Sequence, residues 1–233
     1  MKVNNPEKRL NQFWGLVDQK HVEVIAKKIV GKNVLDMGSG LGTTTKQLTD
    51  KGFNCIGFDY DSESVEYCKK VYPDCKFVVA NAEHLPYDDN CFDTIILRDA
   101  LHHFYCEGDF EKIAKEMVRV SKNNARIIFF DPNVNFMIKT LRKISAHKDV
   151  ECKFETAMEI MKKLGAVNIE HRFNTIYSLQ LSGGYVGVNF TPNVKFIQKM
   201  ILSSERFFES IFNKIGLGRY LCWRYIITGD LKK

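Results

Sequence analysis

The chain alternates between short apolar runs and longer stretches in which apolar and polar residues are mixed at regular spacing. A short, continuous apolar run is typical of a strand buried on both faces of a parallel sheet. Apolar residues three and four positions apart are typical of a helix with one buried face. The apolar runs that predict strands lie at 33–35, 54–59, 76–80, 91–97, 125–130, 167–172 and 221–228. With helices between most of them, we expect an α/β fold with a doubly wound, mostly parallel seven-stranded sheet.

Three segments lie outside this alternation and are expected to be additions to the sheet. Residues 1–31 carry apolar residues at helical spacing and predict an N-terminal helical cap that ends at Gly31. Residues 132–153 and 173–216 follow the fifth and sixth strands, where we expect helical insertions that form a lid over the substrate. The length suits one domain with such additions, so 1–233 is predicted to be a single domain.

The second insertion contains a long apolar stripe. Thr191 and Pro192 have the chemistry of a helix start, and apolar residues then recur at helical spacing from Ile197 to Ile215. We expect this stripe to pack in the core, and the competing interpretation is peripheral contact with a membrane surface. No stretch of the sequence is long and apolar enough to predict a transmembrane helix.

A glycine-rich turn follows the first predicted strand. The sequence runs Val34-Leu-Asp-Met-Gly-Ser-Gly-Leu-Gly42, and helical spacing resumes at Thr43. Its three glycines lack a Cβ, so the backbone can adopt positive φ and a ligand can approach the main chain closely. The dinucleotide fingerprint has its third glycine where Thr43 stands, and Asp36 would repel a pyrophosphate. A nicotinamide-dependent oxidoreductase is therefore the disfavoured alternative.

This turn resembles the first motif of the class I S-adenosylmethionine-dependent methyltransferases, in particular those of the type 11 group. The cofactor of that family carries a sulfonium and an amino group but no phosphate, which suits the carboxylate of Asp36. The resemblance is strongest over residues 33–131, and it implies a Rossmann-like methyltransferase fold with S-adenosylmethionine as the cofactor. Retention of the three glycines and of Asp59 argues against a second alternative, a non-catalytic binding protein with the same fold.

Further cofactor-binding residues are expected at the ends of the next strands. Asp59 ends the second strand 23 residues after Asp36, close to the separation at which a carboxylate reaches a ribose diol. In the family, the turn after the third strand begins with an aspartate that contacts adenine; Asn81 stands there, and its amide oxygen can still accept a hydrogen bond. The resemblance implies a cofactor site formed by Asp36, Gly38, Ser39, Gly40, Gly42, Asp59, Tyr60, Asn81, Ala82, Glu83 and Arg98, with Trp14 of the cap as a further member.

Methyl transfer from a sulfonium needs few catalytic side chains because the donor is already activated. A hydroxyl acceptor would benefit from a general base near the reacting methyl, at the ends of the fourth and fifth strands. His102 and His103 follow the fourth strand, Asp131 ends the fifth, and His147 in the first insertion is a fourth candidate. Among these, His103 and Asp131 rank slightly ahead. Adjacent helical residues diverge by about 100°, so one histidine is expected to face the pocket and the other to face outward.

Composition and charge narrow the expected partners. A net charge of +6 is too small and too dispersed to indicate nucleic acid, and the end of the fourth strand lacks the motifs of DNA methyltransferases. Seven cysteines without a Cys-x-x-Cys pair predict free thiols in a reducing compartment and no metal site. With no visible signal sequence, we expect a cytoplasmic methyltransferase acting on a small-molecule or glycan- or lipid-linked acceptor, with oxygen favoured as the acceptor atom. The sequence does not indicate the oligomeric state.

Overall fold

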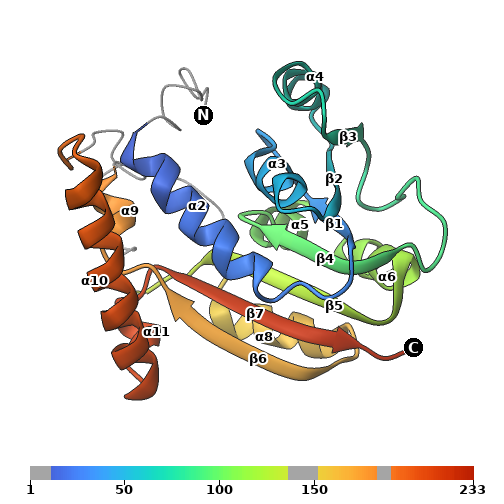
Figure 1. Ribbon diagram of the computed structural model, residues 1–233. Coiled ribbons are helices and arrows are strands. Elements are labelled where there is room, and N and C mark those ends of the chain that lie inside the picture. Colours follow the sequence, from blue (N-terminus) through green and yellow to red (C-terminus); the bar gives the residue numbers. More distant parts are fainter. Residues whose placement is uncertain (1–11, 136–151, 183–189) are drawn as a thin grey trace. The chain divides into compact units, whose positions relative to one another are not determined.

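The computed structural model describes residues 12–135, 152–182 and 190–233 (Figure 1). The chain forms two compact units, and each is assembled from separate stretches of sequence. The first unit contains Met1–Val24, Asn133–Asp149 and Arg172–Tyr225, and the second contains Ile25–Pro132, Val150–His171 and Ile226–Lys233. The first unit thus collects most of the predicted cap and insertions. Their role as a substrate cover, and the description of the whole as a single domain, stay predictions.

The strands form one seven-stranded sheet. They are β1 (Asn33–Met37), β2 (Asn54–Asp59), β3 (Lys76–Val79), β4 (Phe92–Arg98), β5 (Ser121–Pro132), β6 (Ala166–Asn174) and β7 (Arg224–Leu231), in the order β3-β2-β1-β4-β5-β7-β6. β1 is parallel to both neighbours, since Leu35 pairs with Ile56 of β2 and with Ile95 of β4. The pairs β2–β3 and β4–β5 are also parallel, whereas the arrows of β6 and β7 point in opposite directions in Figure 1. The predicted α/β fold with a mostly parallel sheet is confirmed.

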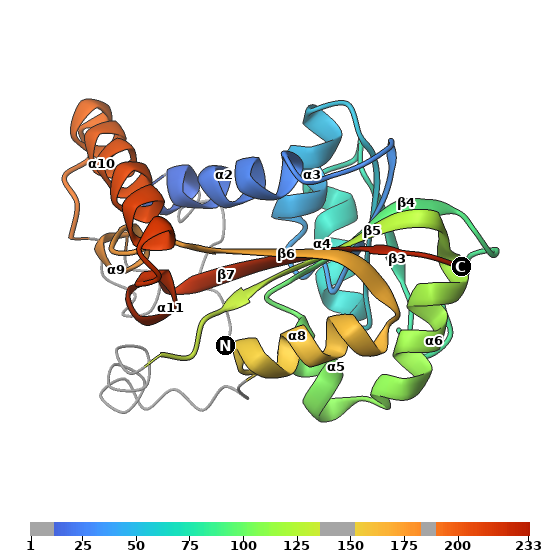
Figure 2. The same ribbon diagram turned by 90° about the horizontal axis from the view of Figure 1, so that it is seen from below.

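The middle strands of this sheet form the core of the second unit. Leu35, Ile95, Ile127 and Phe129 are fully buried. Helix α3 (Thr43–Asp50) lies on one face of the sheet, and α5 (Leu101–Glu107), α6 (Phe110–Val120) and α8 (Phe154–Lys163) lie on the other (Figure 2). Because helices cover both faces, the middle strands must be apolar on both sides, which accounts for the continuous apolar runs in the sequence.

Helix starts in the second unit follow from local side-chain chemistry. Asp61 precedes α4 (Ser62–Val71), and its carboxylate accepts hydrogen bonds from the backbone N–H groups of Glu63 at 3.3 Å and Ser64 at 3.2 Å. Asp109 caps α6 in the same way by accepting from the N–H of Lys112 at 3.3 Å. Because Asp61 caps α4, the nearby Asp59 is left for another role.

In the first unit, a buried ion-pair cluster joins α2 (Phe13–Ala26) to α10 (Lys195–Lys214). Lys20 of α2 forms an ion pair with Glu205 and lies 2.6 Å from Oε1 of Glu209, and all three side chains are buried. Glu205 also accepts hydrogen bonds at 2.8 Å from the backbone N–H groups of residues 176, 177 and 178. Burial raises the pKa of the Glu205 carboxyl, but Lys20 and Ser178 hold it below its usual value. Two short helices, α9 (Ser178–Leu181) and α11 (Gly218–Leu221), complete this unit.

The predicted burial of the apolar stripe on α10 is wrong. Met200 and Phe207 are 56% and 63% exposed, whereas Glu205 and Glu209 on the same helix are buried. The physical reason is Lys20, which gives the two carboxylates a partner inside the unit that the sequence pattern alone does not reveal.

Two predicted helix boundaries in the chain are also wrong. α10 begins at Lys195, and the hydroxyl of Thr191, instead of capping it, donates a hydrogen bond to the carbonyl of Leu181 at 3.2 Å. α2 ends at Ala26 and not at Gly31, which lies at a positive-φ turn just before β1. Residues 136–151 of the first insertion and 183–189 of the second lie outside the described residues. In the described part of the chain, no helix has the length and apolar character needed to cross a membrane.

Candidate active site

The glycine-rich turn between β1 and α3 is built on positive φ angles. Gly38, Gly40 and Gly42 have φ values of 74°, 49° and 73°. The N–H groups of Gly38 and Ser39 both donate to the carbonyl of Phe58 in β2, at 3.0 and 2.9 Å. The turn is therefore fixed to the end of the neighbouring parallel strand.

The space around each glycine shows which side of the turn is open. A Cβ on Gly42 would lie 2.7 Å from the ring of Phe77, and one on Gly38 would lie 2.9 Å from the Cβ of Ala100. A Cβ on Gly40 would meet no atom within 4 Å, so Gly40 is required by its φ angle and not by packing. The main chain at Gly40 thus faces open space from which a ligand can approach.

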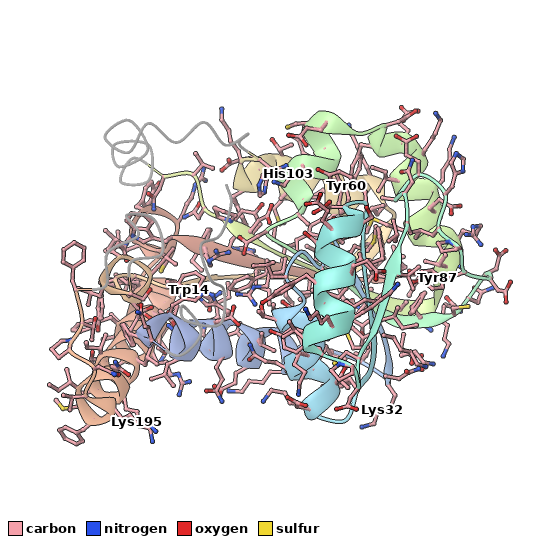
Figure 3. All side chains as sticks on the ribbon, turned by 90° about the horizontal axis from the view of Figure 1, so that it is seen from above. Trp14, Lys32, Tyr60, Tyr87, His103 and Lys195 are labelled. Atoms are coloured by element: carbon pink, nitrogen blue, oxygen red, sulfur yellow. The ribbon has the colours of Figure 1, made fainter. Side chains whose placement is uncertain are left out.

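Asp59 ends β2 beside this turn. Its Oδ2 accepts a hydrogen bond from the N–H of Gly40 at 2.8 Å, and its Oδ1 accepts from the N–H of Asp61 at 3.1 Å. A carboxylate has about four lone-pair positions, so two backbone bonds hold Asp59 in place and leave acceptor capacity for a ligand. Tyr60 follows directly and is 80% exposed at the end of the strand (Figure 3).

Asp36 lies inside the second unit at the end of β1. It is 1% exposed, and its Oδ2 accepts a hydrogen bond from the hydroxyl of Thr45 at 2.7 Å. Burial raises the pKa of Asp36 to about 6, although the hydrogen bond from Thr45 and the positive charge of Arg98 oppose the change. Arg98 at the end of β4 in turn donates to the hydroxyl of Thr44 at 3.1 Å. The sequence analysis missed Thr44 and Thr45; the run of threonines at the start of α3 was the available signal.

The turn after β3 is held by Asn81. Its side-chain oxygen accepts a hydrogen bond from the N–H of Glu83 at 2.9 Å, which leaves one lone pair of the oxygen for a ligand. Asn81 is exposed and Ala82 is buried. Glu83 is turned toward α6, where its Oε1 accepts from the N–H of Asp109 at 3.1 Å.

His102 and Asp131 form a buried pair at the ends of β4 and β5. Nδ1 of His102 lies 3.2 Å from Oδ2 of Asp131, and the same oxygen accepts from the backbone N–H of His102 at 3.3 Å. Asp99, between β4 and α5, has a φ of 55°, a sparsely populated conformation for a residue with a side chain. This bend lets the N–H of Asp99 donate to the carbonyl of Phe130 at 3.0 Å, so the start of α5 is fixed next to Asp131.

His103 lies on the outer side of α5 (Figure 3). Its side chain is 51% exposed, and its Nδ1 lies 3.3 Å from a carboxylate oxygen of Glu107 one turn later. The two adjacent histidines therefore point differently, and His102, not His103, lies beside Asp131. Which residue acts as the base stays a prediction.

Trp14 belongs to the first unit. There it packs against the buried pair formed by Leu179 and Trp223. Its predicted contact with the cofactor stays a prediction, whereas the other candidate residues all lie in the second unit.

Among the candidate site residues, two buried oxygen atoms have no hydrogen-bond partner in the described part of the chain. They are the hydroxyl oxygen of Ser39 in the glycine-rich turn and Oδ1 of Asp131. Buried polar atoms in proteins are normally paired, so both indicate that a polar ligand or its water completes the site. Together with the open side of Gly40 and the remaining acceptor capacity of Asp59, these atoms fit a ligand that carries hydroxyl groups and positive charge. S-adenosylmethionine has both.

Comparison with known proteins agrees with this geometry. Residues 35–129 match the family model described as a methyltransferase domain. An uncharacterised methyltransferase of Bacillus subtilis is 36% identical over 103 residues, which are 42% of this chain and 40% of that protein. A demethylmenaquinone methyltransferase of Paenarthrobacter aurescens is 30% identical over 99 residues, 42% of this chain and 38% of that protein. The matched part thus spans about two fifths of the length of either relative.

The similarity of fold extends further along the chain. The crystal structure of a SAM-dependent methyltransferase from Archaeoglobus fulgidus superposes with a TM-score of 0.64 at 17% sequence identity. The superposition covers 93% of this chain and 94% of that one. Residues 35–129 are therefore similar to a methyltransferase domain, and the chain shares the fold of a solved S-adenosylmethionine-dependent methyltransferase.

Proposed function

We propose that this protein transfers a methyl group from S-adenosylmethionine to a small-molecule acceptor, with oxygen as the favoured acceptor atom. The demethylmenaquinone methyltransferases among the relatives support a small-molecule acceptor with a lipid-like part. The observation that carries the preference for oxygen is the buried pair of His102 and Asp131. A hydroxyl group loses its proton when it is methylated, and this pair can take that proton.

In the proposed mechanism, Asp131 is a positioning residue and His102 is the base. Oδ2 of Asp131 accepts the hydrogen of Nδ1 of His102, which leaves Nε2 as the nitrogen that accepts a proton. S-adenosylmethionine supplies an activated methyl group on a positively charged sulfur. The proton released from the acceptor hydroxyl passes to Nε2 of His102, and Asp131 stabilises the imidazolium that results.

The remaining site residues bind and orient the cofactor in this proposal. The carboxylate of Asp59 accepts hydrogen bonds from the ribose hydroxyls, while its bond to the N–H of Gly40 fixes its orientation. Asn81 and the backbone of Ala82 would hold the adenine, together with Tyr60. Asp36 and Arg98, with opposite charges at the ends of β1 and β4, bind the amino-acid end of the cofactor. These roles are supported by the residues' positions at one edge of the parallel sheet.

The first experiment tests the donor. Calorimetry with S-adenosylhomocysteine is expected to show micromolar binding, about −7 to −8 kcal/mol, and titration with NADH to show none. Binding of NADH without binding of S-adenosylhomocysteine would refute the proposal at its first step.

The second experiment tests the base. Formation of S-adenosylhomocysteine from S-adenosylmethionine is measured with a panel of hydroxylated aromatic and isoprenoid acceptors. His102→Ala is expected to lower kcat by about 100-fold or more while leaving the affinity for S-adenosylhomocysteine unchanged. His103→Ala, which removes the exposed neighbour, is the matched control and should retain activity. An unchanged kcat in His102→Ala would remove the basis for preferring oxygen.

A further inference from the structure

Helix α10 has its polar and apolar faces reversed relative to an ordinary surface helix. Its buried residues are Gln198, Leu202, Glu205 and Glu209, three of which are polar. Its outward side chains are mainly large and apolar: the exposed fractions are 72% for Phe196, 38% for Ile197, 56% for Met200, 63% for Phe207 and 42% for Phe208. At about 100° per residue, these five positions fall within an arc of roughly 120°. They form a mainly apolar face, in which the exposed Ser204 and Lys214 also lie, here called the outer face of α10.

The inward polar residues keep this orientation fixed. Both carboxylates pair with Lys20, and Glu205 binds three backbone N–H groups as well. Turning α10 over would leave Lys20 and these N–H groups buried without partners, at a cost of several kcal/mol. The exposure of the aromatic residues is therefore built into the first unit.

The exposed charged residues of α10 itself all have one sign. Both acids of α10 are buried, so its exposed charged residues are the basic ones, Lys195, Lys199, Arg206 and Lys214. Lys195, Lys199 and Arg206 project on one flank of the outer face, about 60° to 100° from Phe196. Arg206 also forms a surface ion pair with Glu23 at 2.9 Å. An apolar face bordered by lysine and arginine is the pattern of a helix that lies in a lipid–water interface.

We propose that the outer face of α10 binds the surface of an anionic phospholipid bilayer. Phe196, Met200 and Phe207 insert among the upper acyl chains, and Lys195 and Lys199 contact lipid phosphates. A helix of 20 residues is about 30 Å long and lies flat along the surface, with its buried face still attached to the protein. A second copy of the chain in antiparallel pairing fits this face less well, because that pairing would bring the same basic flanks together. The proposal is independent of the methyl-transfer reaction.

Co-sedimentation with vesicles tests the proposal on the full chain. The protein is expected to sediment with vesicles of equal parts phosphatidylcholine and phosphatidylglycerol, and much less with phosphatidylcholine alone. The double variant Phe196→Ser/Phe207→Ser should bind the mixed vesicles at least about tenfold more weakly, since each buried aromatic ring contributes to partitioning. Its thermal midpoint should match that of the wild type, because both rings are exposed in the free protein.

Charge variants test whether the vesicles bind the basic flank of α10 in particular or respond only to the net positive charge of the protein. Lys195→Glu/Lys199→Glu is expected to reduce binding to the mixed vesicles. Lys70→Glu/Lys232→Glu changes the net charge by the same amount at exposed positions outside α10. This control variant is expected to retain most of the binding to the mixed vesicles. An equal loss of vesicle binding in the two double charge variants would overturn the proposal. If the Phe196→Ser/Phe207→Ser variant does not fold, the single variants Phe196→Ser and Met200→Gln are tested for vesicle binding in its place.

Two other outcomes would also overturn the proposal. One is failure of the wild-type protein to sediment with the mixed vesicles. The other is a dimer in sedimentation velocity that the Phe196→Ser/Phe207→Ser change abolishes, which would assign the outer face to a second copy of the chain.

Discussion

Replacing Asp36 by asparagine is expected to stabilise the protein at neutral pH while weakening cofactor binding. Asp36 is buried, and burial raises its pKa from 3.8 to about 6. At pH 8 the folded protein therefore holds a carboxylate charge that the unfolded chain accommodates more easily. Asparagine removes this charge and keeps an oxygen that can accept the hydrogen bond from Thr45, now 2.7 Å long.

The size and the pH range of the effect follow from the two pKa values. Below about pH 3 the carboxyl is mostly protonated in both states, and its burial contributes almost no charge-related cost to the free energy of folding. As pH rises through the interval from 3.8 to about 6, the cost of burial grows, and above it the cost is constant at about 3 kcal/mol, since one pKa unit corresponds to about 1.4 kcal/mol. At pH 5 about half of the cost is present. The advantage of asparagine should thus increase by about 1.5 kcal/mol between pH 5 and pH 8.

Urea unfolding at pH 5 and pH 8 measures this difference. The attraction between Asp36 and Arg98 is already contained in the pKa of about 6, because it opposes the effect of burial, so it needs no separate allowance. Asp88→Asn, at an exposed position, is the control and should change stability by less than about 0.5 kcal/mol at either pH. A stability difference for Asp36→Asn that is the same at pH 5 and pH 8 would show that burial does not set the behaviour of this carboxyl.

Two further predictions follow from the geometry. Asp59→Ala should weaken binding of S-adenosylhomocysteine by about 1.5–3 kcal/mol in calorimetry, because the ribose hydroxyls lose a charged acceptor; unchanged affinity would mean that the ribose binds elsewhere. Lys20→Met should lower the free energy of unfolding by about 3–5 kcal/mol, because Glu205 and Glu209 are left buried without their cation. Adding Glu205→Gln and Glu209→Gln to that variant should recover part of the loss, and no recovery would contradict the ion-pair explanation.

The sequence predicts the parts of this structure that depend on local patterns. Strand β2 has the predicted bounds, because a continuous apolar run has one stable arrangement in a sheet that is covered on both faces. The turn at Gly38–Gly42 has the predicted positive φ angles because few other residues tolerate them. In both cases the determining interactions lie within a few residues of each other.

The features that sequence reasoning missed depend on contacts between distant residues. Glu205 is buried because Lys20, far away in the chain, reaches it. The same holds in the candidate site, where the pairing of His102 with Asp131 across β4 and β5 could not be distinguished from a role for His103. The helical spacing correctly indicated that one of the two histidines would be buried and the other exposed, but it did not identify which.

The position of β7 has a consequence for the order in which the molecule can be assembled. β7 lies between β5 and β6 in the sheet, yet it is made after both of them during synthesis. Until residues 224–231 leave the ribosome, β5 and β6 each present an unpaired edge to the surrounding solution. Completion of the sheet must therefore wait for a strand that inserts between two partners, a step that is slow and exposed to aggregation. Closure of the sheet is thus expected to follow the synthesis of residues 224–231.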